Sequence, residues 1–204
     1  EVRGHNEGIT IRGVKMTGLF IFLGIFVVLI AWGIHIRNNI VRYFNATKRA
    51  WAEVANFERQ KVKTLEALET TLNQYTQFEK STLEQVTALR QQILSLNVDH
   101  TDIAQLQQIE KMSKELIRSL NVVVENYPEL KADTLYGKMM DDIQEQNENV
   151  GAAISIFNRN VEVFNNQIEV FPNNIINTMT LSKKTIRPFR DNLATDNFDY
   201  KPNF

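Results

Sequence analysis

The sequence predicts an all-α protein, in which a single N-terminal transmembrane helix continues into an antiparallel bundle of three long helices and a short C-terminal one. Three observations predict this fold. Residues 17–36 are apolar without a formal charge, the residues that follow repeat their apolar side chains at helical spacing, and strand patterns are nearly absent. We expect a polar segment at 1–15, a transmembrane helix at 16–36, a helical bundle at 37–180 and an irregular tail at 181–204.

The apolar run reads TGLFIFLGIFVVLIAWGIHI. A hydrocarbon core of about 30 Å needs about 20 helical residues, and a helix satisfies its own backbone hydrogen bonds in lipid. The alternatives are a buried core helix or a signal peptide, although a signal peptide has a shorter apolar stretch and a small-residue cleavage site. The anchor side chains that we expect to contact lipid are Leu19, Phe20, Phe22, Phe26, Leu29 and Trp32.

Basic residues flank this span unevenly. Arg37, Arg42, Lys48 and Arg49 follow it, whereas Arg3, Arg12 and Lys15 precede it. For a single-pass protein, this difference slightly favours a large domain in the cytoplasm. An extracytoplasmic domain stays open as the alternative.

The first helix has no proline to stop it between residues 17 and 96. Its apolar residues step by three and four, and Tyr75 and Phe78 belong to this stripe. If unbroken, the helix is roughly 120 Å long. Turn formers then precede a second helix, for which Thr101 or Asp102 is the expected N-cap.

Tyr127 and Pro128 end the second helix, because the residue before a proline disfavours the α region. The third helix begins near Ala132 and ends at Pro172, and residues 173–179 add a short amphipathic turn. Its apolar residues alternate by four and three, which indicates an a/d seam. The seam consists of Ile143, Asn147, Val150, Ile154, Phe157, Val161, Phe164, Ile168 and Phe171.

Asparagine is unusually frequent between residues 147 and 174, although it is a mediocre helix former. One interpretation is a hydrated helix surface. The other is that amide side chains bridge to backbone or to an adjacent subunit and fix the register. Both interpretations stay open, and Asn158 and Asn165 are the residues that support the second, since they follow seam residues and recur at heptad spacing.

Composition argues against several functions. The 23 basic and 24 acidic side chains nearly balance, so no nucleic-acid partner is expected. The absence of cysteine excludes disulfides and thiol catalysis. His5, His35 and His100 are too scattered to suggest a shared metal, and Asp99 and Asp102 beside the last are explained by a helix-capping turn. We expect no catalytic residue, no cofactor and no metal, and therefore no enzyme.

Four motifs occur in order along the chain. They are Asn38-x-Ile40-Val41 with Asn45 and Ala50-Trp51-x-x-Val54; Glu79, Leu83, Val86, Ala88 and Arg90; Tyr127-Pro128-x-Leu130-Lys131-Ala132; and Phe157-Asn158-x-x-Val161-x-x-Phe164-Asn165-x-x-Ile168-x-x-Phe171-Pro172. Together these motifs are similar to those of the LemA family. The resemblance covers residues 38–174. One departure is that the family's proline-containing run in the first helix has no counterpart at residues 58–68, which removes a kink.

The resemblance implies a bacterial membrane-anchored helical bundle. Some relatives take part in magnetosome membrane remodelling and others lie near envelope proteases. The function that we expect is a non-enzymatic scaffold that self-assembles into a homo-oligomer and shapes or organises the membrane. The alternative is an adaptor that presents the bundle to an envelope protease or another membrane partner, and a hydrolase or metalloenzyme comes third.

Besides membrane lipid, the expected partners are further copies of the chain or another envelope protein. The candidate assembly residues are Trp51, Tyr127, Pro128, Phe157, Asn158, Phe164, Asn165, Phe171 and Pro172. For the phenylalanines, an ordinary place in the core of the same chain is the competing interpretation.

Overall fold

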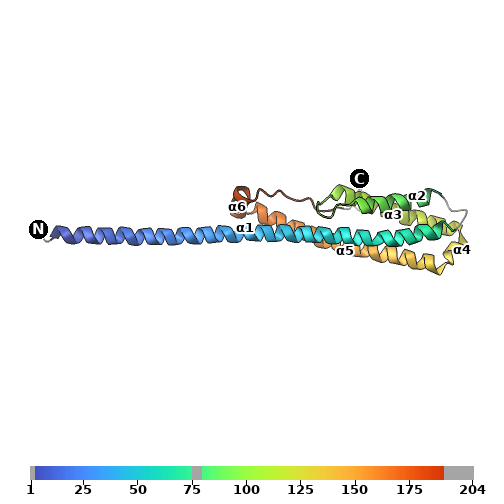
Figure 1. Cartoon of the computed structure of the whole chain (residues 1–204), viewed down its shortest axis with the longest axis horizontal. Helices are drawn as coiled ribbons and strands as arrows, with labels where there is room; N and C mark the ends of the chain where they lie inside the picture. The colour runs from blue at the N-terminus through green and yellow to red at the C-terminus, as the bar shows by residue number, and fades with distance from the viewer. Residues whose placement is uncertain (1–2, 75–79, 191–204) are drawn as a thin grey trace, which may run out of the picture. The chain divides into compact units, whose positions relative to one another are not determined.

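The structure is a computed structural model that describes residues 3–74 and 80–190, with side chains from residue 18 onward except at 131. The described residues form six helices, which Figure 1 labels in chain order. They are α1 (Arg3–Leu72), α2 (Lys80–Ser95), α3 (Ile103–Asn126), α4 (Pro128–Lys131), α5 (Thr134–Glu169) and α6 (Asn173–Thr180). The described residues contain no strand, so the predicted all-α class is confirmed.

Local chemistry sets the ends of α3. The Asp102 side chain accepts a hydrogen bond from the backbone N–H of Gln105, which makes Asp102 the N-cap. At the other end, Tyr127 is the C-cap and Pro128 opens α4 at its first position, where a proline loses no helical hydrogen bond. Both predicted boundaries of the second helix are therefore confirmed.

A single helix over residues 17–96 is wrong. α1 runs through 58–68 without a break, as the missing proline predicts, but it ends at Leu72, and α2 begins at Lys80. The predicted stripe residues Tyr75 and Phe78, like residues 1–2 and 191–204, lie outside the described residues. The bundle thus has one more long helix than expected.

The reason for this break is burial rather than a helix-breaking residue. Thr87 Oγ1 donates to the Glu69 carboxylate at 2.9 Å, and Arg90 forms an ion pair with the same carboxylate. These contacts show that α2 folds back along the last turns of α1. In that arrangement Val86 and Leu89 are buried, which a straight continuation of α1 would not allow.

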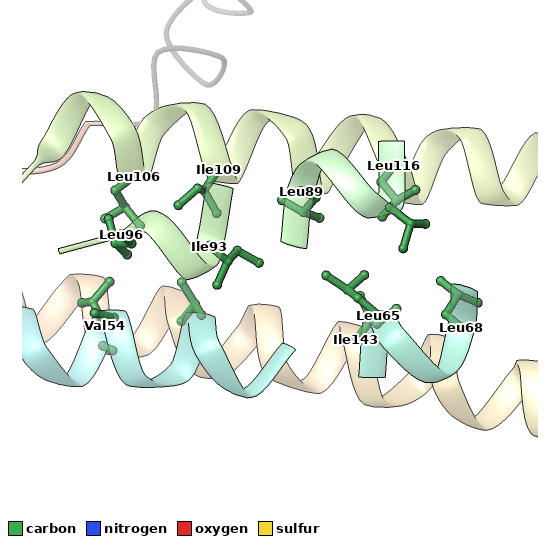
Figure 2. Close-up of a cluster of buried hydrophobic side chains, with 14 of the residues drawn as sticks. Val54, Leu65, Leu68, Leu89, Ile93, Leu96, Leu106, Ile109, Leu116 and Ile143 are labelled. Atoms are coloured by element: carbon green, nitrogen blue, oxygen red, sulfur yellow. The ribbon is translucent and has the colours of Figure 1, made fainter. Parts of the chain in front are cut away.

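The chain forms two compact units, which we call the N-terminal unit (residues 1–43 and 166–184) and the bundle unit (residues 44–165 and 185–204). The core of the bundle unit draws on α1, α2, α3 and α5. Figure 2 shows this convergence, with Val54, Leu65, Leu68, Leu89, Ile93, Leu96, Leu106, Ile109, Leu116 and Ile143 labelled.

Within the bundle unit, aromatic residues join α1 to α5. The rings of Trp51 and Phe157 have centroids 5.5 Å apart, and those of Phe44 and Phe164 lie 5.4 Å apart. The two segments run in opposite directions, because the later α1 residue meets the earlier α5 residue. The Trp51 indole also donates to the backbone oxygen of Asn97 at 2.9 Å, which satisfies its buried N–H.

The predicted seam of α5 is buried at its apolar positions from Ile143 to Ile168, but its last member is not. Phe171 is 78% exposed. The prediction for Phe171 is wrong because α5 ends at Glu169, so this residue no longer follows the helical face. The predicted short amphipathic segment after Pro172 is present as α6.

Phe157→Ala removes a ring packed against Trp51 and leaves a cavity. We expect the free energy of unfolding of the bundle to fall by about 3–5 kcal/mol, measured by urea unfolding of the full chain in a mild detergent. The matched control is Phe171→Ala, which should change it by no more than about 0.5 kcal/mol. Equal effects of the two substitutions would contradict the burial pattern.

Candidate functional site

The first candidate site is the apolar surface of α1 in the N-terminal unit. The six predicted anchor residues are all exposed: Leu19, Phe20, Phe22, Phe26, Leu29 and Trp32. The exposure of large apolar side chains on α1 ends abruptly, since Ile34 is 53% exposed whereas Ile36 is 7% exposed. A core helix of a soluble protein would bury these side chains. Among the described residues, this helix is the one long and apolar enough to cross a membrane.

The second candidate site is a polar cluster buried in the bundle unit. The Nζ atom of Lys61 lies 2.9 Å from Oε2 of Glu58, 2.9 Å from Oδ1 of Asn147 and 3.4 Å from Oγ of Ser113. Lys61 thus donates hydrogen bonds to Asn147 and Ser113 and forms an ion pair with Glu58. A second carboxylate, Glu110, lies 3.8 Å away on α3. The cluster thus joins α1, α3 and α5.

Glu58 is the residue of this cluster whose charge is least well stabilised. Its side chain is fully buried, and neither carboxylate oxygen accepts a hydrogen bond of good geometry, although Lys61 lies close. Burial, opposed by the charge of Lys61 and assisted by the neighbouring Glu110 carboxyl, raises the pKa of Glu58 to about 7. The cluster can therefore take up or release a proton near neutral pH.

This cluster was not predicted from the sequence, although the sequence contains a signal for it. Glu58 and Lys61 continue the core stripe of Val54, Leu65 and Leu68 at steps of four and three, so charged residues occupy positions of the apolar stripe. A charge in a core position requires a buried partner.

The third candidate site is a set of asparagines that hold the tail segment, which we define as residues 182–190. Asn158 Nδ2 donates to the Phe189 carbonyl at 2.9 Å, and Phe189 N–H donates back to Asn158 Oδ1 at 2.8 Å. Asn165 makes the same pair of bonds with Ile186, at 2.9 and 3.0 Å. Of the interpretations left open by the sequence, bridging to backbone describes these two residues.

The spacing of these two pairs follows from backbone dimensions. Asn158 and Asn165 are seven residues apart on α5, a rise of about 10.5 Å. Ile186 and Phe189 are three residues apart, and an extended chain covers about 10 Å over three residues. The rise of seven helical residues on α5 therefore matches the length of three extended residues of the tail segment. A third amide, Asn177 of α6, pairs in the same way with Lys183 in the N-terminal unit, at 2.9 and 3.0 Å, and was not predicted.

The remaining predicted residues have separate locations. Tyr127 lines a groove between α2 and α3, of about 500 Å³, together with Arg118 and Val122. Phe157 and Phe164 are buried within their own chain, which favours the core interpretation for both rings. The structure therefore does not bring the predicted assembly residues together at one surface.

The fold and the exposed apolar segment define a helical-bundle protein with an N-terminal helix long and apolar enough to cross a membrane. Residues 50–195 match the family described as the LemA family. The chain belongs to this family, which confirms the resemblance seen in its motifs.

A curated relative is Protein LemA of Metamycoplasma hominis. It is 29% identical over 123 residues, which cover 60% of this chain and 54% of the relative. The chain therefore matches about half the length of that protein.

Asn158→Ala removes both hydrogen bonds to Phe189. We expect the Phe189 amide to exchange its hydrogen about tenfold faster or more, since the lost bonds are worth about 1–3 kcal/mol. Hydrogen exchange of the full chain in detergent measures this. Asn160→Ala is the control, because the Asn160 amide donates to Ile156 of its own helix. Unchanged exchange in Asn158→Ala would contradict the role of the asparagine.

The buried Glu58 carboxyl makes stability depend on pH. Its pKa is raised from 4.5 to about 7, so the folded chain holds more protons than the unfolded chain between these values. The free energy of unfolding consequently falls as pH rises through this window, by up to about 3 kcal/mol. Glu58→Gln cannot ionise and should flatten this part of the profile.

Urea unfolding of the full chain between pH 4 and 8 measures this effect. Glu53→Gln is the matched control, because Glu53 is an exposed carboxylate on the same helix, and its profile should parallel that of the unaltered chain. A Glu58→Gln profile that also runs parallel would show that Glu58 does not titrate in this window.

Proposed function

We propose that this protein is a non-enzymatic scaffold that α1 anchors in a bacterial inner membrane and that self-assembles through its helical bundle, shaping or organising the membrane. The observation that carries the anchor is the exposed apolar surface of α1, which ends between Ile34 and Ile36. Such a surface is stable in lipid and costly in water. Each CH₂ group removed from water contributes about 0.8 kcal/mol.

Self-assembly is supported by apolar side chains that the bundle unit leaves uncovered. Large exposed aliphatic residues occur on three of its helices: Leu94, Val122, Leu135 and Ile156. An anchor confines copies of the chain to two dimensions, which raises their effective concentration. Weak contacts between such residues then suffice for assembly.

The flanking charges support a proposal for the side of the membrane on which the bundle lies. Four basic residues after the span and three before it support a bundle in the cytoplasm. Protease added to intact spheroplasts should leave a cytoplasmic bundle undigested. Digestion of the bundle would place it on the outer side.

Light scattering of the full chain in a mild detergent and in nanodiscs tests self-assembly. We expect a particle of several chains in both media, and a monodisperse monomer in both would contradict the proposal. Ile156→Glu places a charge at an exposed aliphatic position and should shift the particle to fewer chains. Ser155→Glu is the matched control, because Ser155 is an exposed polar residue beside it, and it should leave the mass unchanged.

An adaptor for an envelope protease or another membrane partner is the second candidate. The groove between α2 and α3 favours it, because this groove combines the cation Arg118 with the exposed aliphatic Val122. Such mixed surfaces are typical of binding sites for peptides and proteins. Crosslinking in membranes followed by purification should then recover a second protein, and a Val122→Glu variant should lose it. Recovery of the chain alone would reject the adaptor.

A further inference from the structure

The outer face of α6 carries apolar side chains that nothing in the described chain covers. Met179 is 76% exposed and Ile175, four residues earlier, is 48% exposed, and Phe171 just before the helix is exposed as well. Residues four apart lie on one side of a helix. The opposite side faces inward, because Asn177 is buried and binds the Lys183 backbone.

The inward side also fixes where α6 lies along α1 in the N-terminal unit. A Cβ atom placed on Gly33 would lie 3.6 Å from Cδ1 of Ile176, so the two helices are in contact there. Gly33 is next to Ile34, the last exposed apolar residue of α1 before burial begins at Ile36. α6 therefore lies at the level where the apolar surface of α1 ends.

Two features at this level are typical of a membrane–water interface. Trp32 is exposed one residue before the contact, and tryptophan is enriched at bilayer interfaces. The chain carries no charge between Glu169 and Lys183, and a second lysine, Lys184, follows directly. An amphipathic segment followed by lysines is suited to the headgroup region of a bilayer that contains anionic lipids.

We propose that the outer face of α6, formed by Ile175 and Met179, inserts into the headgroup region of the bilayer that α1 crosses, together with the exposed Phe171 just before the helix. The inference rests on the proposed membrane anchor. α6 then acts as a second membrane contact beside the span. It sets how far α1 enters the bilayer, because its apolar face and the polar amides behind it define the depth of the interface.

Single cysteines provide the test, since the chain has none of its own. Met179→Cys, Gln60→Cys and Phe26→Cys are each labelled with an environment-sensitive fluorophore in the full chain. The labelled proteins are placed in phosphatidylcholine–phosphatidylglycerol vesicles. Quenching is compared for iodide in the water and for nitroxide lipids labelled near the headgroup or deep in the acyl chain. Gln60 is the control because it is an exposed residue of the bundle unit that lies outside the proposed assembly residues.

We expect the Met179 probe to be quenched by the shallow nitroxide and to emit at shorter wavelength than the Gln60 probe, which iodide should quench. Iodide quenching of the Met179 probe, or shielding from both quenchers by a second chain, would overturn the inference. The deep nitroxide should quench the Phe26 probe. Loss of that signal would reject the anchor itself, whereas its persistence beside an aqueous Met179 probe rejects the α6 contact alone. Ile175→Cys is a second reporter on the same face and must agree.

Discussion

The packing of α1 against α5 is the interaction on which the bundle unit depends. Trp51 meets Phe157 and Phe44 meets Phe164, so large rings fill the space between two helices that run in opposite directions. The other helices complete this pair: α2 folds back along α1, and α3 adds Leu106 and Leu116 to the same core. Aromatic rings of this size bury about 150–250 Å² each. We therefore expect the loss of one ring to destabilise the bundle unit more than the loss of one aliphatic contact.

The buried cluster around Lys61 gives this packing its register. Moving two charges out of water costs several kcal/mol for each ion, so such a group is stable only where its hydrogen-bond partners are in place. Asn147 and Ser113 come from two other helices and meet the ammonium at one relative position of α1, α3 and α5. A shift of α3 or α5 by one turn, about 5.4 Å, would take Ser113 or Asn147 away from the lysine and leave it with Glu58 of its own helix. The cluster is therefore better explained as a device for specificity than as a source of stability.

The sequence was most informative where local chemistry decides the structure. Asp102 and Pro128 set helix ends through their own side chains, and the heptad pattern of α5 identified its buried face up to Ile168. The break after Leu72 was not predictable, since apolar stripes continue on both sides without a proline or glycine. Tertiary burial of α2 decides it. The partners of Asn158 and Asn165 were also hidden, because they are backbone groups of an irregular segment, which leave no pattern in the side chains.

The proposed membrane anchor requires that α1 passes from lipid to protein surroundings at a defined residue. Spin labels placed singly at positions from 18 to 44 in the full chain, reconstituted in bilayers, measure this by collision with oxygen and with a water-soluble nickel complex. We predict high oxygen accessibility through Ile34 and low accessibility to both reagents at Ile36 and Ile40, which are buried. High accessibility to the nickel complex throughout residues 18–34 would contradict it.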